Sequence, residues 1–395
     1  MSHRTATAAL DGAAQLRQPA PHEGFDSTMR SLVIRSIAAV GAAALLTLGT
    51  ACSNEREGST ASTDGKGFGK DALIGVALPA KTSENWVLAG DLFTNGLKEA
   101  GFKGDVQYAG ASTTVADQQA QISSMVTKGA KVIVIGATDA SQLSTQVSQA
   151  KEAGATVIAY DRLITNTKDV DYYIAYDNFK VGQLQGQALV DGMKAKKPKG
   201  PWTIELFSGS PDDNNSKVFF DGAMEVLKPL IDKGDIVVGS KQTDIKQTAT
   251  QGWKAENAQQ RMDSLLTSAY GGKKTLDGVL SPNDTLARAI LTSVKGAGKP
   301  VPVVTGQDSE VESVKSIMAG QQYSTINKDT RKLVAETINM VKSLQKGDKP
   351  TINDTKSYDN GSKVVPSYLL PPVIVTKKNA AEAYANDPKL SPLTK

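Results

Sequence analysis

The chain has little cysteine and little histidine. Cys52 is the only cysteine among 395 residues, and the two histidines, His3 and His22, both precede the predicted folded region. A single cysteine excludes an internal disulfide and a zinc site built from several thiolates. The lack of later histidines excludes a His-dependent catalytic triad and a His-ligated metal from the folded region. We therefore expect no metal site and no cofactor.

An excess of charge of one sign is missing as well. The chain has 45 Lys and Arg residues against 41 Asp and Glu residues, a net charge of +4, and its body contains no dense basic run. A nucleic-acid-binding protein normally shows a basic stripe or a recognition motif, so we expect no nucleic-acid partner. The composition, 39% hydrophobic and 22% charged, is that of a globular protein. Its length predicts two domains, because single cores stop growing near about 250–300 residues.

Residues 29–51 have the layout of a secretory signal peptide. Two arginines precede an apolar run over residues 37–51, which is about 15 residues long and too short to span a membrane. We therefore predict that translation starts at Met29 and that residues 1–51 are a leader and signal peptide.

The apolar run ends in Leu48-Gly49-Thr50-Ala51-Cys52, which resembles a lipoprotein signal, where small residues precede the cysteine that receives lipid. Gly49 departs from that pattern, which prefers leucine at this place. The polar stretch that follows is rich in Gly, Ser and Thr and is typical of a flexible tether. We predict lipidation at Cys52 and a tether over residues 52–70; the alternative is that Cys52 is an incidental thiol.

From residue 72 onward, apolar β-type runs alternate with amphipathic helical stretches. The run from Lys131 to Ile135 is β-branched without polar alternation, as expected for a parallel strand buried on both faces. Roughly eleven βα periods follow one another, about twice what one open sheet needs. We predict an α/β fold with two doubly wound lobes, joined by about three hinge crossovers near Tyr172–Asp177, Ser324–Lys328 and Val364–Leu370.

Three crossovers divide the chain between the lobes, because no long Pro- or Gly-rich linker separates two continuous domains. We expect an N-terminal lobe over residues 71–176 and 328–362. The C-terminal lobe is then formed by residues 177–327 and 363–380, and residues 381–395 form a tail.

Polar side chains gather directly after the predicted strands. In open α/β sheets ligands bind beyond the carboxyl ends of the strands, so these side chains are the candidates for a binding site. Carboxylates, amides and cations make strong hydrogen bonds to hydroxyl groups, and indole faces can cover the C–H face of a sugar ring. The combination is typical of a sugar site. The candidate residues are Asn85, Trp86, Asp161, Arg162, Asn214, Asn215, Trp253, Asn283, Asp308 and Lys328.

Several of these positions also have a purely structural interpretation. Asn283 and its neighbour Asp284 could cap the following helix. Trp86 and Trp253 could fill gaps in the core, and Asp213 could simply be solvated in a turn. No single residue is specific, so the prediction depends on the repetition of polar groups at successive strand ends.

Six segments make the chain recognisable as a whole. They resemble the monosaccharide-binding proteins of bacterial ABC importers, in the xylose-binding and multiple-sugar-binding branch, and the resemblance covers residues 73–376. It implies a type I periplasmic binding protein fold. The segments are Ala159–Ile164, Gly209–Asn215, Ser281–Asp284, Gly306–Asp308, Thr325–Thr330 and Val364–Leu370.

The resemblance also implies roles for the candidate residues. Trp86 and Trp253 match the aromatic positions that sandwich the sugar ring, and Lys328 lies at the hinge. Asn85 stands where this branch usually has arginine; an amide has fewer donors and a shorter reach, so the preferred sugar does not follow from the fold. The residues that would hold sugar oxygens are Asp161 and Arg162 in the first lobe, and Asn214, Asn215, Asn283 and Asp308 in the second.

We therefore predict a monomeric binding protein, lipid-anchored at the outer face of the cytoplasmic membrane. It captures an aldose such as xylose, glucose, galactose or arabinose between two closing lobes and delivers it to an ABC transporter permease. The alternative is a sugar-sensing receptor that presents bound sugar to a signalling partner. A LacI-type effector domain would need an N-terminal helix-turn-helix. A glycosidase would need two carboxyl groups placed across the scissile bond, whereas here carboxylates are mixed with amides and cations.

The sequence predicts that Cys52→Ser abolishes membrane retention, because the chain has no other thiol to receive lipid. Fractionation and the size of the processed chain measure this. The variant should be released into the medium or stay uncleaved. Identical fractionation and processing of variant and wild type would contradict lipidation.

Overall fold

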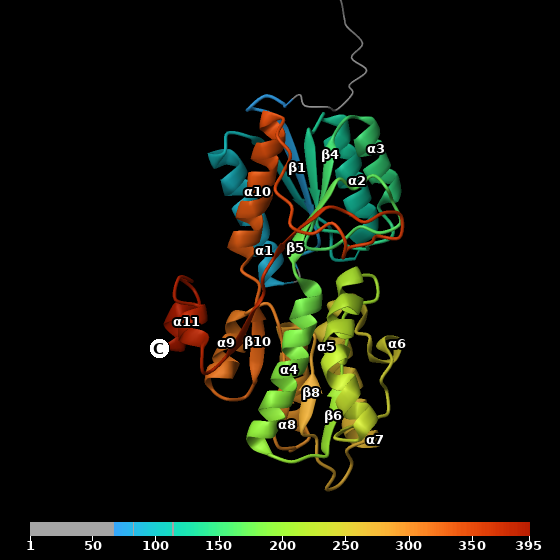
Figure 1. Ribbon diagram of the computed structural model, residues 1–395, viewed down its shortest axis with the longest axis vertical. Helices are drawn as coiled ribbons and strands as arrows, with labels where there is room; N and C mark the ends of the chain where they lie inside the picture. The colour runs from blue at the N-terminus through green and yellow to red at the C-terminus, as the bar shows by residue number, and fades with distance from the viewer. Residues whose placement is uncertain (1–66, 82, 113) are drawn as a thin grey trace, which may run out of the picture. The chain divides into compact units, whose positions relative to one another are not determined.

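The computed structural model describes residues 67–395 except 82 and 113 (Figure 1). The predicted leader and signal peptide, Met29, Cys52 and most of the predicted tether lie outside the described residues. Within the described part of the chain, no helix is both long enough and apolar enough to cross a membrane.

The N-terminal lobe is a parallel sheet covered on both faces. Within the described residues its strand order is β11-β5-β4-β3-β1-β2, and all five pairs are parallel. The strands are β1 (Leu73–Leu78), β2 (Lys103–Tyr108), β3 (Val132–Ile135), β4 (Thr156–Tyr160), β5 (Tyr172–Tyr176) and β11 (Ser367–Leu370). β3 consists of four fully buried residues, as predicted for a strand covered on both faces.

Two pairs of helices enclose this sheet. α2 (Thr114–Thr127) and α3 (Ser144–Glu152) share one apolar cluster with the sheet, and α1 (Glu84–Glu99) and α10 (Thr330–Lys346) share the other. Figure 1 shows α1 and α10 on one side of β1 and β4, with α2 and α3 on the opposite side. This arrangement is one doubly wound lobe.

The C-terminal lobe repeats the plan with a smaller sheet. In the part of the chain that the structure describes, its parallel strands follow the order β7-β6-β8-β9. They are β6 (Trp202–Leu206), β7 (Ile236–Val238), β8 (Gly278–Leu280) and β9 (Val303–Val304). β10 (Ser324–Asn327) and β12 (Val373–Thr376) form an antiparallel pair beside this sheet.

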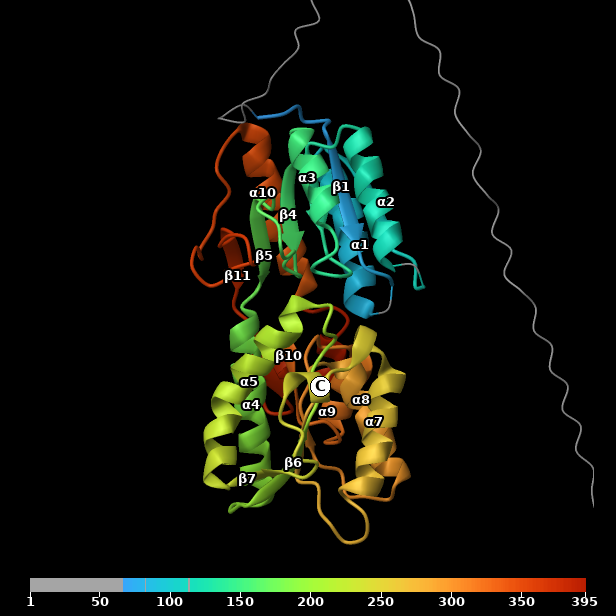
Figure 2. The ribbon, with the colours of Figure 1, turned by 90° about the vertical axis from the view of Figure 1, so that its right-hand side faces the viewer.

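The helices of this lobe also lie in two layers, which Figure 2 shows on either side of β6. α4 and α5 share one core cluster with the sheet, and α7 and α8 share the other. The predicted class, two doubly wound α/β lobes with parallel sheets, is confirmed. The helices are α4 (Asn178–Lys196), α5 (Asn214–Lys233), α6 (Ile245–Thr248), α7 (Ala255–Ser268), α8 (Asp284–Gly296), α9 (Val311–Met318) and α11 (Ala380–Ala383), with short 3-10 turns η1 (Gln251–Trp253) and η2 (Ser391–Thr394).

The third crossover lies later than the sequence predicts. We expected residues 363–380 in the C-terminal lobe, but β11 pairs in parallel with β5 at the edge of the N-terminal sheet. The chain therefore stays in the N-terminal lobe through Leu370, passes Pro371 and Pro372, and enters the other lobe at β12. Local sequence cannot reveal this, because β11 and β12 are both short apolar runs and only their pairing partners differ.

Residues 381–395 are not a separate tail. Tyr384 and Leu390 are buried in a cluster with Val314 of α9 and Val375 of β12. The C-terminal residues are thus a folded part of the C-terminal lobe. The pattern hides this, because the two buried residues belong to no sustained helical or strand period.

The contact between α4 and α5 depends on glycine. A Cβ atom on Gly182 would overlap the carbonyl oxygen of Phe219, and one on Gly186 would lie 2.8 Å from the carbonyl oxygen of Ala223. Both helices begin at the crossover side of the lobe, where Asn178 and Asn215 interact (3.0 Å). Close backbone packing therefore sets where these two residues meet.

We expect Gly182→Ala to lower the free energy of unfolding by about 1–3 kcal/mol, because the added methyl group meets backbone atoms that cannot move independently. Gly296→Ala is the matched control: it is an exposed helical glycine with open space around its Cβ position, and alanine there should stabilise by about 0.5–1 kcal/mol. Urea titration measures both. Equal midpoints for the two variants would contradict the packing argument.

Candidate functional site

The carboxyl ends of the strands in both lobes face one partly open cavity with a volume of about 110 Å³. This is room for one small molecule. Nine of the ten predicted site residues line it: Asn85, Trp86, Asp161, Arg162, Asn215, Trp253, Asn283, Asp308 and Lys328. The tenth, Asn214, does not.

Asn214 and Asn215 are the first two residues of α5, and only the second lines the cavity. Successive residues of a helix point in directions about 100° apart, so both could not reach the cavity. Asn214 therefore lies outside the lining, and its predicted contact with a ligand stays a prediction. The residue that takes part instead is Asp213, the N-cap of α5, whose Oδ1 accepts the amide of Asn215 (2.9 Å).

The two predicted indoles both border the cavity and are half-buried. Trp86 lies in the first turn of α1 and packs against Gly136, where a Cβ atom would be 3.1 Å from the ring. Its ring meets Tyr160 edge-on, with 6.2 Å between centroids. Part of each indole also packs on the apolar core, so each ring contributes one part to the core and another part to the cavity wall.

Trp253 is held by polar contacts and by an unusual backbone. Its φ is +55°, in the left-handed region that large side chains avoid. Its Nε1 donates to Asp213 Oδ2 at 3.2 Å, and the edge of its ring approaches Gly209 too closely for any side chain there. The conformation costs about 1–3 kcal/mol, and a residue kept at this cost points to a functional constraint on its position.

Arg162 joins the two lobes. Its Nε lies 3.1 Å from Asp213 Oδ2, and both side chains are largely buried. A second guanidinium nitrogen donates to the carbonyl of Ala137 (3.1 Å), and the guanidinium carbon lies 5.3 Å from the centre of the Trp86 ring. The arginine therefore lies over one indole and shares Asp213, a carboxylate from the other lobe, with the second indole.

Asp161 directly precedes Arg162 in the chain, and its backbone is in the left-handed region, with a φ of +61°. Burial raises the pKa of the Asp161 carboxyl, and the nearby cations Lys328 and Arg162 offset part of this rise. The Asp161 carbonyl accepts hydrogen bonds from Tyr173 Oη and Asn215 Nδ2, both at 2.8 Å. These bonds fix the backbone of Asp161 and leave its carboxyl group at the cavity.

Lys328 and Asp308 form a second buried ion pair, with 3.1 Å between Nζ and Oδ1. Burial by itself would lower the pKa of the Lys328 ammonium, but Asp308 and Asp161 outweigh this effect and the pKa is raised. Lys328 therefore stays protonated and acts as a hydrogen-bond donor. Asn85 reaches the same loop from the other lobe, because its Nδ2 donates to the Asp308 carbonyl (3.4 Å).

Asn283 both caps a helix and lines the cavity. Its Oδ1 accepts the amide of Leu286 (2.9 Å) at the start of α8, which leaves its Nδ2 as the group available to a ligand. Asp284 is not a cap. It is fully buried and accepts hydrogen bonds from Gln322 Nε2 (2.8 Å), Thr325 Oγ1 (2.9 Å) and the amide of Glu310 (3.0 Å).

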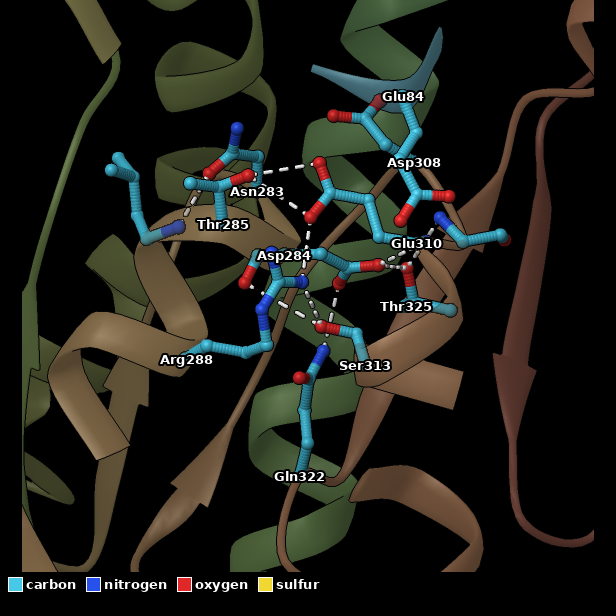
Figure 3. A network of polar contacts seen from close by, with 12 residues as sticks. Glu84, Asn283, Asp284, Thr285, Arg288, Asp308, Glu310, Ser313, Gln322 and Thr325 are labelled. Atoms are coloured by element: carbon cyan, nitrogen blue, oxygen red, sulfur yellow. Dashed lines mark hydrogen bonds and ion pairs between the residues drawn. The ribbon is translucent and has the colours of Figure 1, made fainter. Parts of the chain in front are cut away.

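Figure 3 shows this network together with the cavity-lining residues Asn283, Thr285 and Asp308. Glu310 pairs with Arg288 (2.6 Å) and accepts from Thr285, which lines the cavity. Burial, together with the neighbouring Glu310 and Asp308, raises the pKa of Asp284 well above its usual range. The network ties the loops after β8 and β9 to β10, so it sets the positions of Asn283 and Asp308.

Sequence reasoning missed several residues at the cavity. Asp213 and Gln307 lie in two of the six segments that carry the family resemblance, but no local signal indicates which of several adjacent polar residues points inward. Tyr160 and Tyr176 are the last residues of β4 and β5, a position that could have been used as a signal. The unpredicted lining residues are Ser83, Tyr160, Tyr176, Asp213, Phe219, Thr285, Gln307, Thr330 and Leu333. Among the residues that the structure describes, no group of three or more His, Cys, Asp or Glu side chains could hold a metal ion.

Comparison with known proteins agrees with this architecture. Residues 74–349 match the family described as a periplasmic binding protein domain. The chain belongs to this family. As a periplasmic binding protein it is a solute-binding protein, which confirms the prediction that it is not an enzyme.

Two known relatives and one solved structure illustrate the similarity. The chain is 52% identical to the multiple sugar-binding periplasmic receptor ChvE of Rhizobium radiobacter, over 78% of this chain and 87% of that protein. It is 37% identical to the D-xylose-binding periplasmic protein of Haemophilus influenzae, over 80% and 90%. A solute-binding protein of an ABC transporter from Clostridium phytofermentans, solved with β-D-glucose, has 40% identity and a TM-score of 0.78, covering 82% of this chain and all of that one.

We predict that Asp213→Ala destabilises the protein by about 2–3 kcal/mol. The change leaves Arg162 buried without its partner and removes the cap of α5. Asp212→Ala is the control, because among the described residues this neighbouring carboxylate accepts a hydrogen bond only from Gln251. Urea titration of both variants measures the difference. Equal stability of the two would show that the ion pair across the lobes contributes nothing.

Proposed function

We propose that this periplasmic binding protein captures a monosaccharide in the cavity between its lobes and delivers it to an ABC transporter permease. We further propose that it does so while anchored through Cys52 to the outer face of the cytoplasmic membrane. The observation that supports sugar capture most strongly is the set of residues that line the cavity. Two half-buried indoles and a set of fixed hydrogen-bonding groups surround a space suited to one small polar molecule.

The lining groups match the chemistry of a sugar. Asp161 and Asp308 present carboxylate acceptors, while Arg162, Lys328 and Asn283 present donors. Sugar hydroxyls can donate and accept, so each can satisfy one group of each kind. A buried polar group left unpaired costs about 1–3 kcal/mol, which discriminates among sugars that differ in a single hydroxyl. The names of the relatives favour aldoses such as D-glucose and D-xylose.

Binding and lobe closure are coupled in this proposal. Asp161 and Arg162 belong to one lobe, and Asn283 and Asp308 to the other. One small sugar can contact all four only when the lobes are together, so the sugar binds the closed state more tightly and shifts the population towards it. The permease would then recognise the outer rims of the lobes in the closed arrangement.

A second candidate function is sugar sensing, in which the loaded protein contacts a signalling partner instead of, or in addition to, a permease. It is favoured by one observation, that the 52% identical relative is described as a receptor. Both candidates share the sugar site and differ only in the protein that reads the closed state.

A thermal-shift panel of monosaccharides tests the proposal, with wild type and Trp253→Ala side by side. A sugar present at about 100 times its dissociation constant should stabilise the wild type by about 2.7 kcal/mol. Trp253→Ala should weaken binding of the same sugar by about 1–3 kcal/mol through loss of apolar area over the ring. Calorimetric titration gives the affinities.

Two controls separate the possible outcomes. Trp253→Phe retains an aromatic face but loses part of the ring area and the hydrogen bond to Asp213, so its affinity should lie between those of wild type and Trp253→Ala. Scattering should give a smaller radius of gyration with sugar bound. Stabilisation by no monosaccharide, or unchanged affinity in a folded Trp253→Ala protein, would count against the proposed function.

A further inference from the structure

The C-terminal segment, residues 384–395, touches the immediate neighbours of site residues from both lobes. We call this segment the C-terminal strap. Figure 1 shows the chain end beyond α11 beside α9 of the C-terminal lobe. Its polar contacts reach three separate elements that border the cavity.

On the C-terminal lobe, the strap supports the loop that carries Asp308. Tyr384 is buried, and its hydroxyl donates to Ser309 Oγ at 2.6 Å. Asp308 and Ser309 both have positive φ, +96° and +53°, so this loop needs fixed contacts to keep its shape. Tyr384 supplies one of them directly beside the ion pair between Asp308 and Lys328.

On the N-terminal lobe, the strap forms two ion pairs. Lys389 Nζ lies 2.7 Å from Glu84 Oε2, in the first turn of α1. Asp387 Oδ2 lies 2.8 Å from a guanidinium nitrogen of Arg331, in the first turn of α10. Glu84 directly precedes Asn85 and Trp86 in the chain.

The ion pair between Arg331 and Asp387 belongs to a larger polar network near Lys328. Arg331 also forms an ion pair with Asp329, with 2.8 Å between Arg331 Nε and Asp329 Oδ1. Asp329 directly follows Lys328 in the chain. Within the strap, Asp387 Oδ1 accepts the amides of Lys389 and Leu390. One turn of the strap therefore presents a carboxylate and an ammonium together to the opposite lobe.

We propose that the C-terminal strap bridges the lobes beside the cavity, holds them together and slows release of the bound sugar. This inference rests on the proposed function for its ligand. Because the strap is packed on one lobe and paired with the other, its ion pairs can form only while the lobes are together. They therefore act on the closed state and on the dissociation rate, with little effect on association.

The size of the effect follows from exposure. Lys389 and Glu84 are 66% and 48% exposed, and exposed pairs change an equilibrium only about 1.5- to 5-fold and are screened by salt. The Arg331–Asp387 pair is more buried, because only 33% of the Arg331 side chain and 15% of the Asp387 side chain are exposed. A modest, salt-sensitive effect on sugar release is the expected signature, in contrast to the loss of binding expected for residues that touch the sugar.

A double-mutant cycle on the exposed pair tests the proposal. The variants are Glu84→Gln, Lys389→Gln, both together, and the charge swap of Glu84→Lys with Lys389→Glu. Lys378→Gln is the matched control, since it removes the same charge from a nearby exposed lysine for which the described residues provide no ion pair. The probe is the aldose with the largest shift in the thermal panel, and its dissociation rate is followed by tryptophan fluorescence in 20 and 500 mM NaCl.

At low salt, Lys389→Gln should release the sugar about 1.5- to 5-fold faster than Lys378→Gln. The double variant should be no worse than the single variants, because both remove the same pair, and the charge swap should restore slow release. High salt should erase the differences. Additive effects of the two single variants, or equal dissociation rates for Lys389→Gln and Lys378→Gln, would overturn the proposal that the strap slows sugar release.

A second measurement does not depend on the sugar, because the ion pairs also stabilise the fraction of unliganded protein in which the lobes are together. Hydrogen exchange of the unliganded protein should be faster at residues 387–391 in Lys389→Gln than in Lys378→Gln, and equal rates would count against the strap. If no aldose binds the wild type, the proposed function fails, and the exchange data alone then decide whether the strap bridges the lobes.

Discussion

The ion pair between Arg162 and Asp213 connects the two lobes of this protein at the place where a ligand would lie. A buried charge is costly unless it is paired and hydrogen-bonded, so neither side chain can occupy the cavity without the other. Asp213 at the same time caps α5 and accepts the indole N–H of Trp253. One carboxylate therefore fixes an arginine, a helix start and an aromatic wall, and the shape of the cavity depends on it.

The backbone at the site is strained where the chemistry is concentrated. Asp161, Trp253, Asp308 and Ser309 all have positive φ, which costs roughly 1–3 kcal/mol for each non-glycine residue. Each is held by contacts from outside the loop, such as the bonds from Tyr173 and Asn215 to the carbonyl of Asp161. The folded lobes thus supply the energy that keeps these side chains directed at the cavity before any ligand arrives.

A second layer of polar residues determines how rigid this arrangement is. Asp284 is fully buried and satisfied by three donors, and Glu310 is bonded to Arg288 and Thr285. A polar network of this kind favours one loop geometry. Its carboxylates are paired, whereas Gln322 Oε1 is buried without a hydrogen-bond partner among the described residues. The polar network and the strap both contact the same loop, through the neighbouring residues Glu310 and Ser309.

Local sequence was sufficient for the features that depend on short-range chemistry. Apolar runs such as Val132–Ile135 predict buried parallel strands, and polar residues at strand ends predict where a site forms, because parallel strands bring their carboxyl ends to one edge. Nine of the ten candidate residues meet in one cavity for that reason. Tertiary structure decided the rest: which of Asn214 and Asn215 points inward depends on where α5 begins. The lobe that receives β11, and the packing of Tyr384 and Leu390, depend on partners far away in the sequence. Pairing and burial over such separations have no local signature, because the same short apolar run satisfies either lobe.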